Sequence, residues 1–162
     1  MADVILVSGS INAGKTTVSR LLARRIPRTA HVEVDALRAF VPWMPLEESI
    51  PLNLRNATAV ARHFLEAGLH VVVDYPLGPE HHDRLTRELS GLADAIHGFV
   101  LAPPLKVALL DRGRRLDEWE RDRIRVLYRQ GFHDPGFGIA IDNGSQTPDE
   151  TVAEILAHLG RA

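Results

Sequence analysis

The chain has 162 residues, of which 45% are hydrophobic and 25% are charged, so it is long enough to bury one core and is expected to form a single domain over 1–162. Its formal net charge of −2 argues against a broad basic surface for duplex nucleic acid or an anionic membrane, and the lack of cysteine excludes a disulfide framework and a thiol nucleophile. With neither a signal-peptide pattern nor an apolar run near the roughly 20 residues of a membrane span, the expected location is the cytoplasm.

Hydrophobic patterns of the strand and helix types alternate along the chain. Such alternation favours an α/β fold with a largely parallel sheet. The stretch at about 40–51, which is rich in proline, has no clear period. Strands are predicted at about 3–8, 31–35, 70–74, 96–102 and 138–143, and helices at about 15–26 and 53–67, from Pro79, from Pro104 and after the capping residue Thr147.

Residues 9–16 read GSINAGKT and match the phosphate-binding pattern GxxxxGKT without departure. A strand pattern precedes them and a helix pattern follows, and this context separates a phosphate-binding loop from a chance match. Gly9 and Gly14 let backbone N–H groups converge on a phosphate, Lys15 supplies positive charge, and Thr16 offers a hydroxyl to Mg²⁺. The chain is therefore predicted to bind a nucleoside triphosphate. The loop residues expected to contact it are Gly9, Asn12, Ala13, Gly14, Lys15, Thr16 and Thr17.

Carboxylates end two of the predicted strands, at the edge of the sheet where ligands bind in open α/β folds. Period-two alternation places Glu33 and Asp35 on one face of the second strand, where one could accept a proton from a substrate hydroxyl and another could hold a water bound to Mg²⁺. Glu33 could instead be the partner of an arginine. Asp74 closes a buried valine run in the Walker B manner and could reach Mg²⁺ through water, face an acceptor substrate, or cap the loop before Pro76. Whether Asp35 or Asp74 is the base stays open.

A highly charged segment extends over about 111–129. It can be interpreted as a solvent-facing helix with ion pairs at i,i+3 and i,i+4. Alternatively, some of its guanidinium groups form a lid that closes over a triphosphate and neutralises the transferring charge. Arg112 and Arg115, which flank Gly113, are the predicted lid residues, and Arg121 is the next candidate.

With these motifs the chain resembles the small P-loop kinases, which include gluconate kinase, shikimate kinase, chloramphenicol phosphotransferase and relatives of adenylate kinase. The resemblance covers nearly the full length. It implies a three-layer α/β fold in which helices flank a five-stranded parallel sheet of order 2-3-1-4-5. It also implies a helical region for the acceptor at about 37–66 and a short lid at about 112–123. The motifs that carry it are residues 9–16, Glu33 with Asp35, and residues 71–74, 99–115 and 141–150.

The same resemblance implies roles for individual residues. Arg112 would stack on the adenine, and the loop that contains Asn143 would pack against it. Asp35 matches the aspartate that is the proposed base in chloramphenicol phosphotransferase and its closest kin. The chain departs from the family at residues 11–13, where many such loops are richer in glycine and serine, and in the short lid.

These observations predict an ATP- and Mg²⁺-dependent phosphotransferase that moves the γ-phosphoryl group to a hydroxyl of a small-molecule acceptor. Arg38 and Arg55 are candidates to hold an anionic acceptor and Trp43 is a possible stacking surface, although each could equally be a packing or solvated residue. The predicted catalytic residues are Lys15, Asp35, Arg112 and Arg115. The predicted substrate-binding residues are Asp35, Arg38, Arg55 and Asp74, and the predicted metal-binding residues are Thr16 and Asp74.

Two other functions fit the same motifs. A kinase that acts on a polynucleotide end would need a basic groove near 37–66, where the chain offers only Arg38, Arg55 and Arg62. A nucleotide-gated regulatory module would hydrolyse ATP slowly without an acceptor. Sugar acids, nucleosides, nucleotides and antibiotics all remain possible acceptors. The choice between ATP and GTP and the oligomeric state are also open.

Overall fold

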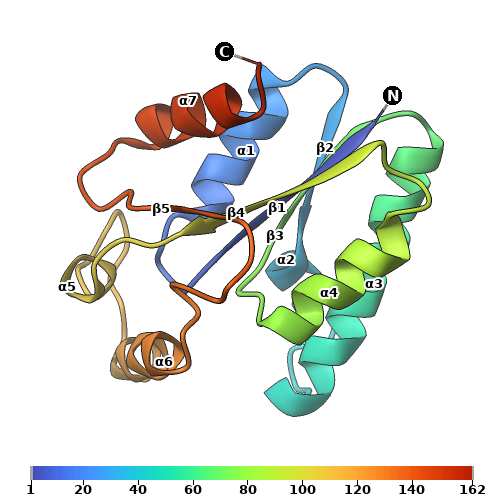
Figure 1. The fold of residues 1–162 in the computed structure, drawn as a ribbon. Coiled ribbons are helices and arrows are strands. Elements are labelled where there is room, and N and C mark those ends of the chain that lie inside the picture. Colours follow the sequence, from blue (N-terminus) through green and yellow to red (C-terminus); the bar gives the residue numbers. More distant parts are fainter. Residues whose placement is uncertain (1, 162) are drawn as a thin grey trace.

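A computed structural model describes residues 2–161, in which five parallel strands form one sheet with helices on both of its faces (Figure 1). The strand order is β2-β3-β1-β4-β5, which confirms the predicted fold class and topology. The elements in chain order are β1 (Asp3–Gly9), α1 (Lys15–Arg25), β2 (Thr29–Glu33), α2 (Val34–Arg38), α3 (Leu46–Glu66), β3 (His70–Asp74), α4 (Pro79–Leu89), β4 (Ala95–Leu101), α5 (Leu105–Ala108), α6 (Glu118–Arg129), β5 (Ile139–Ile141) and α7 (Pro148–His158).

The central strand β1 divides the hydrophobic core into two halves. Because successive side chains point to opposite faces of a strand, Val4 and Leu6 pack against α3 and α4, whereas Ile5 and Val7 pack against α1 and α7. All four side chains are buried, as expected for a parallel sheet that is covered on both faces. Within residues 2–161, no helix has the length and apolar character needed to cross a membrane.

The carboxyl ends of β1, β2 and β3 meet at one edge of the sheet. Val7 pairs with Asp74, and Glu33 also pairs with Asp74 on the other side of β3. The loop after β1 therefore begins near the last residue of β3, which in turn pairs with the last residue of β2. This is the edge at which open α/β sheets bind their ligands.

The second strand ends earlier than the sequence pattern indicates. β2 stops at Glu33, and Asp35 lies in the first turn of the short helix α2. The prediction that Glu33 and Asp35 share one face of a strand was therefore wrong. A carboxylate near a helix N-terminus interacts favourably with the helix dipole, and the residues that follow, ALR, are good helix formers.

Helix α3 begins at Leu46, within the stretch that has no clear period in the sequence, and it continues through Pro51. A proline inside a helix removes one backbone hydrogen bond and costs about 3 kcal/mol. The cost is offset by burial of the long apolar side of α3, which packs against the sheet through Leu54, Ala57 and Ala61. Tertiary packing thus extends the helix beyond the limit that local sequence suggests.

Candidate active site

The loop between β1 and α1 has a backbone that requires glycine at both ends. Gly9 has φ 138°, and a Cβ there would lie 2.5 Å from the carbonyl oxygen of Leu101 on the neighbouring strand. Gly14 has φ 95° and immediately precedes α1. No acidic residue occupies the first turn of α1, so its unpaired N–H groups and dipole are available to an anion. The loop is thus shaped to cradle a phosphate.

Lys15 lies at the end of this loop, and its Nζ donates a hydrogen bond of 2.6 Å to the backbone carbonyl of Ser10. Burial lowers the pKa of Lys15 to about 8, although the nearby carboxylates of Asp74 and Asp35 oppose the shift. The ammonium group therefore still carries its charge near neutral pH. A phosphate bound in the loop would be its natural counter-ion.

Asp74 provides the test of whether this site fits a divalent cation. It is only 2% exposed, and within residues 2–161 neither of its carboxylate oxygens has a hydrogen-bond partner. His31 Nε2 lies 3.3 Å from Oδ1 of Asp74, but the two atoms are not aligned for a hydrogen bond. A buried carboxylate without partners is costly unless a cation or ordered water satisfies it. Asp74 and the hydroxyl-bearing Thr16, which line the same pocket, therefore fit Mg²⁺.

A pocket of about 690 Å³, the first pocket, surrounds the phosphate-binding loop. Gly9 and Ala13 belong to the loop but are buried and do not line this pocket. Arg55 and Arg115 do not line this pocket, and Arg38 lies in a second pocket next to it. Most of the predicted site residues line the first pocket, namely the nucleotide and metal residues Asn12, Gly14, Lys15, Thr16, Thr17, Asp74, Arg112 and Asn143 and the predicted base Asp35.

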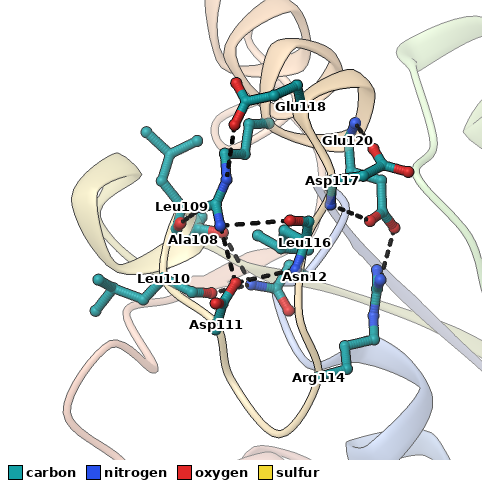
Figure 2. A network of polar contacts seen from close by, with 11 residues as sticks. Asn12, Ala108, Leu109, Leu110, Asp111, Arg114, Leu116, Asp117, Glu118 and Glu120 are labelled. Atoms are coloured by element: carbon teal, nitrogen blue, oxygen red, sulfur yellow. Dashed lines mark hydrogen bonds and ion pairs between the residues drawn. The ribbon is translucent and has the colours of Figure 1, made fainter.

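Two asparagine side chains fix the loop to distant parts of the chain. The buried amide of Asn143 donates a hydrogen bond of 2.8 Å to the carbonyl of Ala13. The amide of Asn12 donates bonds of 2.9 Å each to the carbonyls of Ala108 and Leu110, near the end of α5 (Figure 2). Both predicted nucleotide residues thus hold the loop in shape, besides lining the pocket.

The lid loop, residues 111–117, joins α5 to α6 and brings arginines to the first pocket. Arg112 Nη1 lies 3.4 Å from the backbone carbonyl of Asn12, to which it donates a hydrogen bond. Arg114 also lines the pocket and forms an ion pair of 2.6 Å with Glu120 (Figure 2). Arg115 is exposed and has neither an ion pair nor a side-chain hydrogen bond within the described residues. The geometry therefore supports Arg112 and Arg114, rather than Arg112 and Arg115, as the arginines nearest a bound phosphate.

Arg121, which the sequence offered as the next candidate for the lid, does not line the first pocket. Its guanidinium donates hydrogen bonds to the carboxylate of Asp111 at 2.9 Å and to the backbone carbonyls of Leu109 and Leu116. It lines neither pocket. Arg121 therefore fastens the lid loop to α6, and its donors are already used within the protein.

The second pocket, of about 540 Å³, lies between α2, α3 and α6. It shares Ile11, Asp35, Tyr75, Pro76 and Arg114 with the first pocket, so the two pockets are continuous. The carboxylate of Asp35 is exposed at this junction. A group bound in one pocket can therefore meet a group bound in the other beside Asp35.

The surroundings of Asp35 make its carboxylate a better proton acceptor than an ordinary aspartate, because they raise its pKa. The surrounding protein desolvates it and raises its pKa, while Lys15 and Arg38 lower the pKa and Asp74 and Glu33 raise it further. Glu33 itself forms an ion pair of 3.0 Å with Arg20. The alternative in which Glu33 is the partner of an arginine is thus confirmed, and Asp35 is the free carboxylate at the junction.

The sequence reasoning missed several pocket residues and selected others, besides Arg115 and Arg121, that lie elsewhere. Arg55 is exposed beside the buried Leu54 on α3, and Trp43 is 80% exposed; neither lines a pocket. The proposed contact of Arg55 with an acceptor therefore has no support from the geometry. Arg114, Trp119 and Arg123 belong to the charged segment at 111–129 that the sequence had indicated, whereas no sequence signal marked Tyr75 and Phe132. The missed residues are Tyr75, Arg114, Trp119, Arg123 and Phe132.

Comparisons with known proteins were made at the level of sequence and of structure. No family model matches the sequence. The adenylyl-sulfate kinase of Paraburkholderia xenovorans is 30% identical over 173 aligned residues, which cover 96% of this chain and 92% of that protein. A sugar kinase from Janibacter sp. is similar in structure with a TM-score of 0.75, at 19% identity over 100% of this chain and 96% of that one. The tunicamycin resistance protein of Deinococcus radiodurans has a TM-score of 0.64 and 25% identity, over 100% and 98% of the two chains. Each likeness therefore extends well beyond the phosphate-binding loop.

Proposed function

This chain belongs to the small P-loop kinase family, and we propose that it transfers the γ-phosphoryl group of ATP to a hydroxyl group of a small-molecule acceptor. The observation that carries this proposal is the junction of the two pockets at Asp35. The first pocket contains the phosphate-binding loop, and the second offers a separate cavity large enough for a small organic molecule. A nucleotide-gated regulatory module would have no need for the second pocket.

In the proposed phosphoryl transfer, each residue at the junction of the two pockets has a separate role. The acceptor oxygen forms a bond to the γ-phosphorus as the bond to the bridging oxygen of ADP breaks, and Asp35 takes the hydroxyl proton. Lys15, Arg112 and Arg114 neutralise the charge that spreads over the phosphoryl oxygens. Because the transition state is largely dissociative, positioning by these groups matters more than the strength of the base.

Thr16 and Asp74 are the residues that would hold Mg²⁺, the hydroxyl directly and the buried carboxylate through water. When bound, the ion would screen the negative charge of the β- and γ-phosphates. This assignment leaves Asp35 as the base, because the unpartnered oxygens of Asp74 are deeply buried. We also expect the enzyme to act in the cytoplasm.

An acceptor panel tests the proposal. Consumption of ATP is measured in the presence of Mg²⁺ with sugar acids, nucleosides, nucleotides, adenylyl sulfate, hydroxylated antibiotics and hydroxylated aromatic acids, and with an oligonucleotide that has a 5′-hydroxyl end. We expect at least one small molecule to stimulate ADP formation and to be recovered as its phosphate ester. If ATP binds but only a polynucleotide 5′-hydroxyl is phosphorylated, with strong loss of affinity as salt rises, the enzyme is an end kinase instead. If no acceptor is phosphorylated, the transferase proposal fails.

A further inference from the structure

The walls of the second pocket are unlike those of a site for a polyhydroxylated molecule. Each sugar hydroxyl that loses water in such a site must gain a hydrogen-bond partner from the protein, so a wall with much apolar surface disfavours a polyhydroxylated molecule. Among the residues that line this pocket, all within 2–161, none is serine, threonine, asparagine or glutamine, and besides the charged side chains only Tyr75, His81 and the indole N–H of Trp119 can form side-chain hydrogen bonds there. Its walls are mainly apolar and aromatic, and they include Pro42, Leu46, Ile50, Trp119, Leu127 and Phe132.

The charged residues of the second pocket leave a positive excess. Glu120 is already paired with Arg114 at 2.6 Å. Arg38 and Arg123 also line the pocket, and within the described residues neither has an ion pair or a side-chain hydrogen bond. Asp35, at the junction with the first pocket, is the one carboxylate left to face them. Two half-buried guanidinium groups therefore face a single carboxylate, that of Asp35. The proposed reaction requires this carboxylate as its base.

The phenol of Tyr75, which also lines the second pocket, lies near both Arg38 and Arg123. Burial and Asp35 raise its pKa to about 12, while Arg38 on α2 and Arg123 on α6 both act in the opposite direction. The two arginines, which come from different helices, therefore both lie within electrostatic range of one phenol. At neutral pH Tyr75 is uncharged and can donate a hydrogen bond into the cavity.

We infer that the acceptor is an amphipathic organic anion, with an apolar, ring-containing body and an anionic group that Arg38 and Arg123 bind. Its reacting hydroxyl lies toward Asp35, and its body packs between Trp119, Phe132 and the apolar side of α3. A carboxylate, sulfate or phosphate would serve as the anionic group, because guanidinium binds all three. This inference rests on the proposed function only for the direction of the reacting hydroxyl. The preference of the pocket for an anion with an apolar body concerns binding alone.

Binding is tested with two matched fluorescent probes, anilinonaphthalene sulfonate and phenylnaphthylamine. Both carry the same aromatic body, and only the first carries a negative charge. Dissociation constants are measured for the wild type, for Arg38→Gln and Arg123→Gln, and for Arg87→Gln as a control on the exposed side of α4. Energy transfer from tryptophan to the bound probe is compared between the wild type and Trp119→Phe, and the part that the variant loses reports a probe beside Trp119 in the second pocket.

The wild type should bind the sulfonate at least about tenfold more tightly than the neutral probe. Arg38→Gln and Arg123→Gln should each remove most of this difference, whereas Arg87→Gln should keep it. Gluconate should not displace the sulfonate. Equal affinities for the two probes, a preference that survives both substitutions, or displacement by gluconate would each overturn the inference.

Turnover separates this inference from the proposed function. ATP-dependent phosphorylation is compared for hydroxymethylbenzoate, neutral benzenedimethanol and gluconate. We expect kcat/KM to be highest for the benzoate and to fall about tenfold or more in Arg123→Gln. Charge-selective probe binding with no phosphorylation of any acceptor on the full panel would refute the kinase proposal alone. Phosphorylation of gluconate in preference to the benzoate would refute the amphipathic acceptor alone.

Discussion

The side chain of Asn12 donates a hydrogen bond of 2.9 Å to the carbonyl of Ala108, so the phosphate-binding loop is tied directly to the end of α5. Asn12 has φ 61°, a left-handed conformation that asparagine tolerates better than most residues. The chain therefore continues from α5 into the lid loop at a point fixed by the phosphate-binding loop (Figure 2). The side chain of Asn12 thus joins the phosphate-binding loop to the start of the lid loop.

Asn12→Gly should destabilise this junction without straining the backbone. Glycine adopts positive φ freely, so the change removes only the two amide hydrogen bonds, at a cost of about 1–3 kcal/mol in the free energy of unfolding. Denaturant titration measures the loss. Asn12→Asp, which replaces the donor with an acceptor, should cost at least as much. An unchanged unfolding midpoint for both variants would show that the bonds contribute nothing to stability.

Lys15→Ala should abolish turnover and leave the fold intact. The change removes the charge that faces the β- and γ-phosphates, which we expect to lower kcat/KM at least about a hundredfold. The chain offers a matched control in Lys106→Ala, since Lys106 is exposed on α5 and lines neither pocket. Turnover and melting temperature are measured for both variants. Lys15→Ala activity within tenfold of wild type would remove this loop from the phosphate site.

Substitution of the lid arginines distinguishes the ones that line the first pocket from the one that does not. Arg112→Ala and Arg114→Ala should weaken ATP binding or turnover far more than they change the melting temperature. Arg115→Ala, by the same measurements, tests the assignment that the sequence alone suggested. We expect it to have the smallest effect of the three, because its side chain is exposed outside the pocket. Loss of turnover in Arg115→Ala alone would restore the original assignment.

Asp35→Asn tests the chemistry at the junction. The amide keeps the shape of the carboxylate but cannot accept the hydroxyl proton, so phosphorylation of the acceptor should fall at least about a hundredfold while ATP affinity stays near wild type. Calorimetric titration of ATP with Mg²⁺ separates the two quantities. Collapse of nucleotide binding would make Asp35 a metal-binding residue and leave Asp74 as the candidate base.

The pH dependence of kcat/KM for the acceptor should reflect the same carboxylate. Desolvation raises the pKa of Asp35, and a base works only when deprotonated, so activity should fall as the pH drops through this raised pKa. The acid limb should therefore lie at a higher pH than for an ordinary aspartate. The residual activity of Asp35→Asn should lack this limb. Persistence of the limb in that variant would assign it to another group.

The fold and the phosphate site could be predicted because their signals are local. The motif at 9–16, the buried valine run before Asp74 and the Thr147 cap each specify structure within a few residues. The residues of the second pocket come from α2, α3, α4, α6 and the connecting loops, and no spacing in the sequence relates Arg38 to Arg123. Only tertiary packing brings them together. The start of α3 at Leu46 was missed for the same reason, since the sheet and not the local period stabilises it.

The hydrogen bonds of Arg121 affect the conformational entropy of nucleotide binding. Its guanidinium, together with the bond from the Leu116 N–H to the Asp111 carboxylate, closes residues 111–116 into a loop held against α6. Ordering a free segment costs about 1–2 kcal/mol per residue in backbone entropy alone. Here that loss occurs during folding, before any ligand arrives. A nucleotide that enters the first pocket therefore finds Arg112 and Arg114 on a backbone that is already ordered, and more of its contact energy remains as affinity.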